Sequence, residues 1–271
     1  MHHVVTGPAG HKFHLGGRHR PKPHKTKSVR RYMTAPLPVA PDSFSYFATN
    51  LGAEHDILGN DTLGDCTAAG ACHLAEAFTG AAGDPVVLTV ADAIKFYSLS
   101  TGYNPSDPST DHGGDEVTVC NTWRDQGLDG AGAHKIAGYI AIDPTDAALV
   151  KSCCWLFGGL YFGIECDDSF TQISGDGFTW GTGTPDPNNG HCVVGAGATP
   201  SGVLINTWGM IGTFTWAAVA QFCADSAGGN LFAILSRELI ASAQAKAPSG
   251  FDFAALVADF DGLGGAIAAS A

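Results

Sequence analysis

The chain has 271 residues, of which 45% are hydrophobic and 15% charged, and it carries a formal net charge of −12. This length and apolar content suit one large domain or two smaller halves, and they exclude a coiled coil and a mostly disordered protein. No run of 18 or more apolar residues occurs, and the first 30 residues lack the apolar block of a secretory signal. We therefore expect a protein that is not secreted by a conventional signal and is either cytoplasmic or part of an assembly such as a virus particle.

Residues 1–36 form an arm rich in Pro, Gly, His and basic residues. Residues 1–31 hold eight of the 14 basic residues and none of the 26 acids, so they carry +8 and leave −20 on the rest of the chain. Two interpretations stay open: the arm contacts nucleic acid or a neighbouring subunit, or it lies on its own acidic body. The cations considered for such contacts are Arg18, Arg20, Lys22, Lys25, Lys27, Arg30 and Arg31.

The globular part extends from about residue 37 to about residue 246. Its first half predicts three helices: one over 66–78 capped by Asp65, one opened by the capping box Thr89-Val90-Ala91-Asp92, and one over 115–126 stopped at Gly127. Asp143-Pro144 then predicts a short helix to about 151, followed by strands over 155–165, 191–198, 202–206, 212–216 and 231–236. Helices before strands indicate an α+β protein with a helical lobe at about 37–135 and a strand-rich lobe at about 136–246.

Residues 247–271 contain a linker and a short C-terminal helix. Ala247-Pro248-Ser249-Gly250 breaks the pattern, and Phe253, Leu256, Val257 and Phe260 then recur at helical spacing. The apolar face of this helix either docks on its own domain or forms an oligomer contact through residues 251–260.

Cysteines and acidic residues give little sign of a metal site. The eight cysteines form no CxxC pair, so we expect no structural zinc site and mostly reduced thiols that fill the core. The acidic set Asp107, Asp111, Asp115 and Glu116 does not have the spacing of a calcium loop, and a solvated acidic loop is the favoured interpretation.

Three separated segments bear the residue types of a nucleophilic site. Cys66 lies at the first turn of a predicted helix, where unpaired N–H groups and the helix dipole favour a thiolate. His191 enters an apolar, Gly-rich strand, and Asn206 follows on the next strand, before Thr-Trp-Gly. Neighbouring strands would place His191 and Asn206 side by side, as a base and the group that orients it.

In this order the motifs resemble those of the papain-like cysteine peptidases (C1-type). That family has a cysteine opening a long helix, a histidine beginning a strand, and then Asn-Ser-Trp-Gly. The resemblance implies a papain-like two-lobed fold, with a helical N-terminal lobe whose long helix opens at Cys66 and an antiparallel, β-barrel-like C-terminal lobe. It also implies that Cys66 is the nucleophile, His191 the base and Asn206 the residue that orients the base.

The resemblance covers about three quarters of the chain, from Leu37-Pro38 to about residue 246, and implies further roles. Trp208 falls on the tryptophan that shields the Asn–His hydrogen bond, and Asn60 falls on the residue that supplies an oxyanion-hole amide. Gly113 and Gly114 resemble the strip that hydrogen bonds an extended substrate. No metal or organic cofactor is implied.

Three departures mark the chain as divergent. Asp65 and Thr67 flank the cysteine where the family has Ser and Trp, and a negative charge at Asp65 would oppose a low thiol pKa. Asn60 is one methylene shorter than the family's Gln. The arm is short and too polar to pack as an inhibitory pro-domain.

Two functions are therefore carried forward. The first is a cysteine endopeptidase that acts through Cys66, His191 and Asn206 by way of a thioester acyl-enzyme. The second is a weak or inactive papain-like fold that serves as a structural subunit, for example of a virus particle, with the basic arm contacting nucleic acid or neighbouring subunits.

Overall fold

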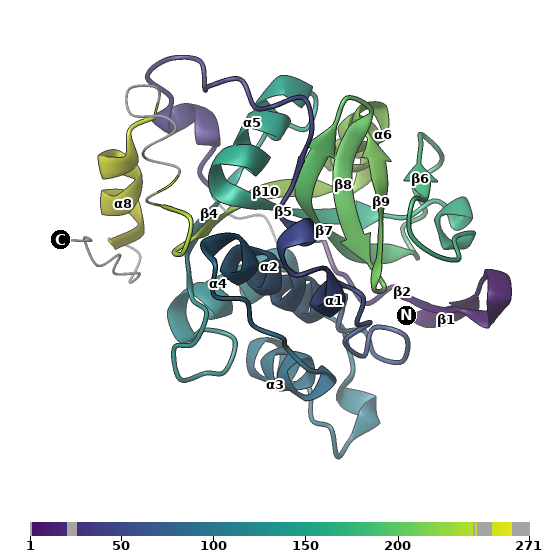
Figure 1. Ribbon diagram of the computed structural model, residues 1–271. Coiled ribbons are helices and arrows are strands. Elements are labelled where there is room, and N and C mark those ends of the chain that lie inside the picture. The colour runs from purple at the N-terminus through teal and green to yellow at the C-terminus, as the bar shows by residue number, and fades with distance from the viewer. Residues whose placement is uncertain (1, 21–25, 241, 243–250, 262–271) are drawn as a thin grey trace.

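A computed structural model describes residues 2–20, 26–240, 242 and 251–261 (Figure 1). They form a single large sheet with helices packed on both faces, which confirms the expected α+β class. Among these residues, no helix has the length and apolar character needed to cross a membrane.

The sheet is antiparallel except at one edge. Its strands lie in the order β4 (Ile136–Ala141), β10 (Asn230–Ser236), β5 (Gly158–Glu165), β7 (Gly190–Thr199), β8 (Gly202–Thr207), β9 (Met210–Thr215) and β6 (Thr179–Trp180), and β3 (Phe44–Ser45) pairs with β7 beside this path. Only β6 and β9 run parallel. Five of these strands are those expected from the sequence. β4 is not, because Ile-Ala-Gly-Tyr-Ile-Ala has no clear alternation of apolar and polar residues.

Seven α-helices lie within the described part of the chain. They are α1 (Leu51–Glu54), α2 (Cys66–Ala82), α3 (Val90–Thr101), α4 (Glu116–Gln126), α5 (Ala147–Phe157), α6 (Trp216–Phe222) and α8 (Phe253–Asp261). The capping box at Thr89 and Asp92 is confirmed, as is Gly127 after α4.

Two predicted helix starts need correction. α5 is capped by Asp146, not by Asp143, and it runs through to Phe157, where the sequence had suggested a strand. Asp65 precedes α2 as expected, but its side chain makes no capping hydrogen bond. Its Oδ1 instead accepts a hydrogen bond from Asn60.

The alternation of side chains along β7 separates two cores. Val193 packs into the core between the sheet, α5 and α6, whereas Cys192, Val194 and Ala196 pack into the core that contains α2, α3 and α4. Successive strand residues point to opposite faces, so each residue of β7 is assigned to one core by its parity. The same alternation fixes the face of the sheet toward which His191, near the start of β7, points.

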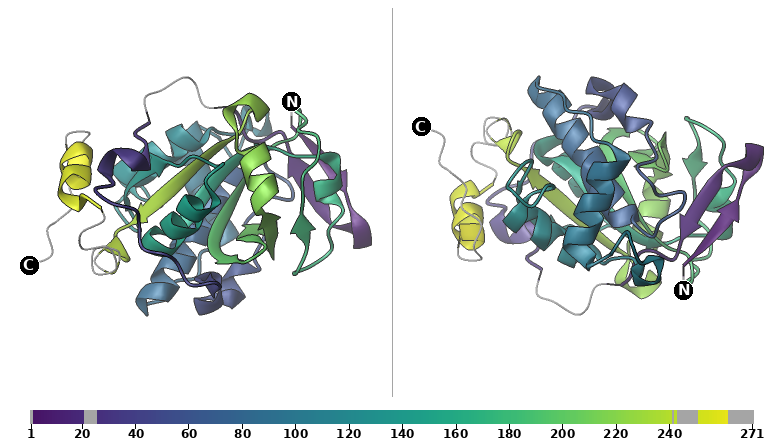
Figure 2. Two further views of the ribbon diagram at one scale, coloured as in Figure 1. Left: turned by 90° about the horizontal axis from the view of Figure 1, so that it is seen from above. Right: turned by 90° about the horizontal axis from the view of Figure 1, so that it is seen from below.

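The N-terminal arm packs on the body through a hairpin, although its polarity had argued against its packing as an inhibitory pro-domain. Its hairpin, β1 (His3–Thr6) and β2 (Lys12–Leu15), inserts Phe13 and Leu15 into the strand-lobe core, where they are 0% and 1% exposed. The two views of Figure 2 place this hairpin at one end of the molecule and the later part of the arm beside α8 at the other. A small number of apolar residues is therefore sufficient to anchor the arm, although the arm is polar on average.

The C-terminal helix docks on its own chain. Phe251 and Leu256 are buried, the Phe251 ring lies 5.4 Å from that of Phe157, and Asp259 accepts a hydrogen bond of 2.8 Å from Tyr32. The predicted linker at 247–250 lies outside the described residues. The proposed oligomer contact through 251–260 stays a prediction.

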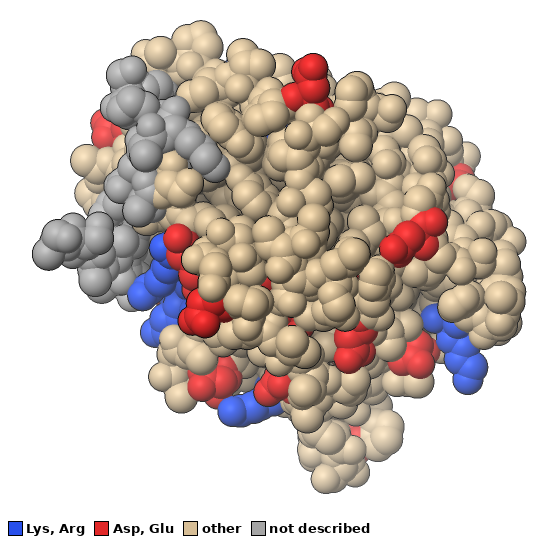
Figure 3. All heavy atoms as spheres, in the orientation of Figure 1, with Lys and Arg blue, Asp and Glu red and all other residues tan. Residues whose placement is uncertain are grey.

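Most of the arm's described cations face acids of the same chain. Ion pairs join Arg18 to Glu116, Arg20 to Glu165, Lys27 and Arg31 to Asp259, and Arg30 to Asp146. On the face drawn in Figure 3, basic side chains are scattered and lie beside acidic ones. The arm thus lies on its own acidic body, one of the two alternatives given by its charge, while Lys22 and Lys25 lie outside the described residues.

Candidate active site

Cys66 opens α2 at the junction of the two lobes and is only 2% exposed. A cavity of about 10 Å³, room for roughly one water, is lined by Cys66 together with Asn60, Asn206 and Trp208. Burial raises the pKa of the Cys66 thiol to about 12, against a hydrogen bond from the Cys192 backbone that lowers it. In this closed arrangement the thiol form dominates, although the helix N-terminus favours a thiolate.

His191 and Asn206 lie on neighbouring strands, as expected, but on opposite faces of the sheet. Asn206 of β8 stands directly opposite Val194 of β7, which is three residues after His191. Directly paired residues share a face, and an odd separation along a strand reverses it. Consequently Asn206 donates to the carbonyl and carboxylate of Glu54, both at 2.8 Å, and within the described part of the chain its Oδ1 has no hydrogen-bond partner.

The partner of His191 is instead Thr207. Its Nε2 lies 2.8 Å from the Thr207 hydroxyl, and its Nδ1 is buried without a hydrogen-bond partner among the described residues. The Trp208 ring stacks on the imidazole with centroids 4.2 Å apart. Burial lowers the pKa of His191 to about 3, with a further decrease from nearby His14, so the ring is neutral in this state.

Asn60, the expected oxyanion-hole residue, borders the Cys66 cavity, but its amide is already engaged. Its Nδ2 donates to Asp65 at 3.2 Å and to the Leu63 carbonyl at 3.3 Å. Burial raises the pKa of Asp65 well above its usual range, which favours the neutral carboxyl. The unfavourable charge expected next to Cys66 is thereby reduced.

A buried ionic cluster borders the cavity through His73 and was not predicted from the sequence. His73 Nδ1 lies 3.4 Å from Glu54 Oε2 and 3.3 Å from Glu76 Oε2, and both glutamates are 0% exposed. Although burial lowers it, the two carboxylates raise the pKa of His73 to about 9. The sequence signal was available, since His73 and Glu76 are three residues apart on the helix that Cys66 opens.

Two side-chain groups in the described residues have the composition of transition-metal sites. One is Glu54, His73 and Glu76, and the other is His2, His14 and Asp111, each with ligand atoms within 4.8 Å of one another. In the first group, a protonated His73 already compensates the buried carboxylates. In the second, Asp111 is engaged by Tyr97 and by the Gly64 amide.

The chain's own arm lies beside the start of α2 and contacts both lobes. Gly114 donates to the Gly17 carbonyl and accepts from the His19 amide, both at 2.9 Å, and Gly16 donates to the Gly190 carbonyl at 2.9 Å. The arm therefore bridges the predicted substrate strip in one lobe and the residue before His191 in the other.

Glycines make this close approach possible. A Cβ at Gly17 would lie 2.7 Å from the Gly64 backbone, and Gly113 takes φ +74° against the Gly17 carbonyl. Because Gly64 is two residues before Cys66, the arm passes directly over the start of α2. The sequence offered Gly113 and Gly114 as a peptide-binding strip, but no pattern identified the peptide as residues 16–19.

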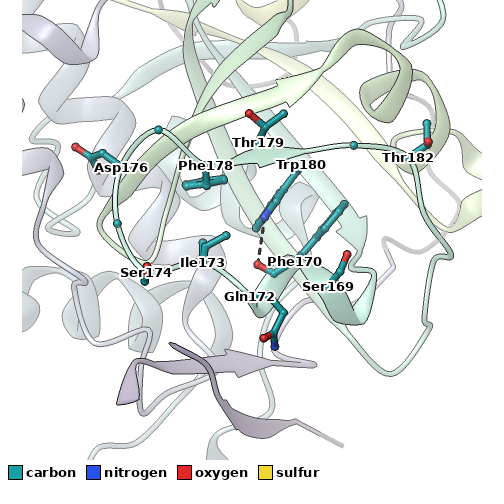
Figure 4. A pocket seen from close by; sticks show the side chains of 13 residues that line it. Ser169, Phe170, Gln172, Ile173, Ser174, Asp176, Phe178, Thr179, Trp180 and Thr182 are labelled. Carbon is teal, nitrogen blue, oxygen red and sulfur yellow. Dashed lines mark hydrogen bonds between the residues drawn. The ribbon is translucent and has the colours of Figure 1, made fainter. Parts of the chain in front are cut away.

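A second hollow, of about 620 Å³, lies in the loop from Ser169 to Thr182 (Figure 4). Its floor is formed by Phe170 and Trp180, whose stacked rings are 4.3 Å apart, and Trp180 Nε1 donates to the Phe170 carbonyl. Its one ionisable residue, Asp176, is engaged by His55 and by the Ile211 amide. It brings none of the predicted site residues together.

Comparison with protein-family models and with curated protein sequences finds no match. Solved structures do match. Xylellain, a cysteine protease from Xylella fastidiosa, is 13% identical, with a TM-score of 0.55 over 80% of this chain and 99% of that one. The cysteine protease and lectin-like domains of Cwp84 from Clostridium difficile are 13% identical, with a TM-score of 0.52 over 79% of this chain and 54% of that one. Procathepsin L2 from Tenebrio molitor is 12% identical, with a TM-score of 0.50 over 81% of this chain and 78% of that one. The predicted papain-like fold is confirmed.

Proposed function

We propose that this chain, which has the fold of the papain-like cysteine proteases, is a thiol-dependent peptidase in a latent form. The observation that carries the proposal is the binding of the arm's own backbone, at residues 16–19, to Gly114 and Gly190 beside the start of α2. Backbone groups that bind one peptide segment offer the same hydrogen bonds to another.

In the proposed reaction, Cys66 attacks the carbonyl carbon of a peptide bond. Its proton passes to His191, whose Nδ1 has no hydrogen-bond partner among the described residues. This step requires the ring to approach Cys66, because His191 does not line the Cys66 cavity in the closed chain. The C–S bond forms, the C–N bond breaks, and His191 returns the proton to the leaving amine. Water then attacks the thioester, and the C–O bond replaces the C–S bond. The Cys66 backbone N–H and the Asn60 amide would bind the oxyanion.

Latency follows from the charge states of the closed cleft. Burial disfavours both the Cys66 thiolate and the His191 imidazolium, so the reactive ion pair is suppressed while the arm is in place. Displacement of residues 16–19 would admit water to both groups and move their pKa values toward ordinary ones.

The second candidate, a structural subunit with a papain-like fold, is favoured by one observation. Asn206 bonds Glu54 and not His191, so the imidazole lacks the orienting partner that the sequence predicted. Under this alternative, Cys66 is one more buried thiol among the eight free cysteines.

A fluorescent epoxysuccinyl probe separates the two. The probe is applied to the full chain and to Gly17→Val, whose added side chain would clash with the Gly64 backbone and displace the arm. Each of these two proteins is compared with versions that also carry Cys66→Ser or His191→Ala. Rapid labelling of Gly17→Val that is lost in both of these versions supports the peptidase. Labelling no faster than that of a free cysteine, and indifferent to His191, supports the structural subunit.

A further inference from the structure

The side chain of Arg18 leaves the arm and enters a pocket between the two lobes. Its guanidinium Nε lies 2.7 Å from Glu116 Oε1 and its NH1 donates to the Gly228 carbonyl at 2.6 Å. The side chains of Arg18 and Glu116 are 1% and 0% exposed. Glu116, which the sequence placed in a solvated acidic loop, is therefore the buried base of a pocket.

The pocket is fixed by elements of both lobes. Glu116 begins α4, and its other oxygen accepts from Asn230 Nδ2 at 3.2 Å, while Asn230 Oδ1 accepts from the Gly163 amide at 2.8 Å. Gly163 leaves room for the guanidinium, because a Cβ there would lie 2.5 Å from Arg18 NH2 and closer still to Glu116 Oε1. The carboxylate thus keeps its orientation independently of Arg18.

A buried carboxylate of this kind requires a cation. Removing one partner of a buried ion pair leaves a desolvated charge, which is among the most destabilising single changes in proteins. A planar guanidinium satisfies Glu116 and the Gly228 carbonyl at once, whereas an ammonium is a compact, strongly hydrated point charge. The pocket therefore matches the charge of arginine and engages Nε and NH1 of Arg18, while its NH2 is buried without a hydrogen-bond partner among the described residues.

We propose that this pocket is a guanidinium-binding subsite of the cleft, which selects an arginine side chain in the peptide substrate and is filled by Arg18 when the arm is closed. The role of the pocket as a substrate subsite rests on the proposed peptidase function, whereas the binding of a guanidinium by Glu116 does not. A peptide that displaces residues 16–19 contacts the same Glu116. Its affinity depends on a positive charge that replaces that of Arg18.

Chemical rescue tests the pocket without any need for activity. Arg18→Ala in the full chain is expected to lower Tm by roughly 10 °C, as the loss of one partner of a buried pair does. Methylguanidinium should then raise Tm by several degrees and methylammonium by much less, and the selective gain should vanish in Arg18→Ala/Glu116→Gln. Arg18→Lys provides a second, milder variant, with a smaller loss that methylguanidinium does not recover.

Arg30 is the matched control, because both side chains of its ion pair with Asp146 are exposed, at 53% and 36%. Arg30→Ala should change Tm by less than about 3 °C and show no selective rescue. Equal effects of the two cations on Arg18→Ala, or a selective gain that survives Glu116→Gln, would overturn the pocket.

Peptide hydrolysis tests the specificity separately. In the Gly17→Val background, a peptide library should favour arginine over its neutral isostere citrulline at one subsite by about 10²-fold or more in kcat/KM, and Glu116→Gln should remove most of that preference. Hydrolysis without an arginine preference overturns the inference and leaves the peptidase intact. Selective rescue without any hydrolysis leaves the pocket intact and overturns the peptidase.

Discussion

The contact between Gly17 and Gly64 predicts how strongly the arm controls the reactivity of Cys66. In Gly17→Val, the added Cβ would lie 2.7 Å from the Cα and the carbonyl oxygen of Gly64. These are backbone atoms at the start of a helix and cannot move aside as a flexible side chain would. The arm must therefore shift, which breaks its two 2.9 Å hydrogen bonds with Gly114.

The magnitude follows from the thiol pKa. Burial raises the pKa of Cys66 from 9.0 to about 12, so at pH 8 the thiolate fraction is about 10⁻⁴ in the closed chain and about 10⁻¹ for a solvated thiol. Because the thiolate is the reacting form, alkylation of Cys66 should accelerate by up to about 10³-fold when the arm is displaced.

Iodoacetamide labelling at pH 8, with the modified cysteine assigned by peptide mass spectrometry, measures this rate. Gly52→Val is the control, because no atom of the described residues lies within 4 Å of a Cβ at Gly52, and this variant should be labelled at Cys66 at the wild-type rate. A Gly17→Val rate equal to that of Gly52→Val would refute the argument, and so would wild-type labelling as fast as that of a free cysteine.

Three further predictions concern the buried groups. The pKa of His73 is raised to about 9, so its contribution to the free energy of unfolding is complete below pH 6.5 and is lost as the pH rises through 9. Urea unfolding should show that the free energy of unfolding falls by about 3 kcal/mol over that range. A free energy of unfolding that stays constant up to pH 8.5 would contradict this prediction. Thr207→Val, which removes the hydrogen bond to His191, should slow epoxysuccinyl labelling of Gly17→Val about tenfold, and an unchanged rate would leave Thr207 without a positioning role. Phe13→Ala should cost about 3–5 kcal/mol in denaturant unfolding, because Phe13 is fully buried; a cost below about 1 kcal/mol would mean that the arm is not part of the core.

Local signals predicted the fold well where they act over a few residues. The capping box at Thr89, the stop at Gly127 and the alternating or Gly-rich strands β7 and β8 all depend on neighbours in sequence. The start of α5 was misplaced because Asp143 and Asp146 both satisfy cap chemistry, and tertiary packing selects the second. β4 lies at one edge of the sheet, held by its pairing with β10, a contact that no local pattern encodes.

The site was harder to predict for a geometric reason. Cys66, Asn60, Asn206 and Trp208 line one cavity, and His191 is not among its lining residues. The pairing register then set Asn206 opposite Val194, and this one-residue parity decides whether Asn206 or Thr207 faces His191. Register depends on the whole sheet, so spacing along the chain could not give it. The catalytic roles of Cys66, His191 and Asn206 stay predictions that labelling can test.

The arm's charge links the two functions that the sequence left open. Arg18 and Arg20 face glutamates that are nearly inaccessible to solvent, Glu116 and Glu165. An arm that binds a polyanion through Arg18 must first withdraw this side chain, which is 1% exposed, and this leaves the buried carboxylate of Glu116 without its counterion. Polyanion binding through Arg18 and the closed arrangement are therefore mutually exclusive, and by linkage a polyanion that binds Arg18 would raise the reactivity of Cys66. Under the proposed functions, the assembly role and the latent peptidase would then depend on one equilibrium, the position of residues 16–20.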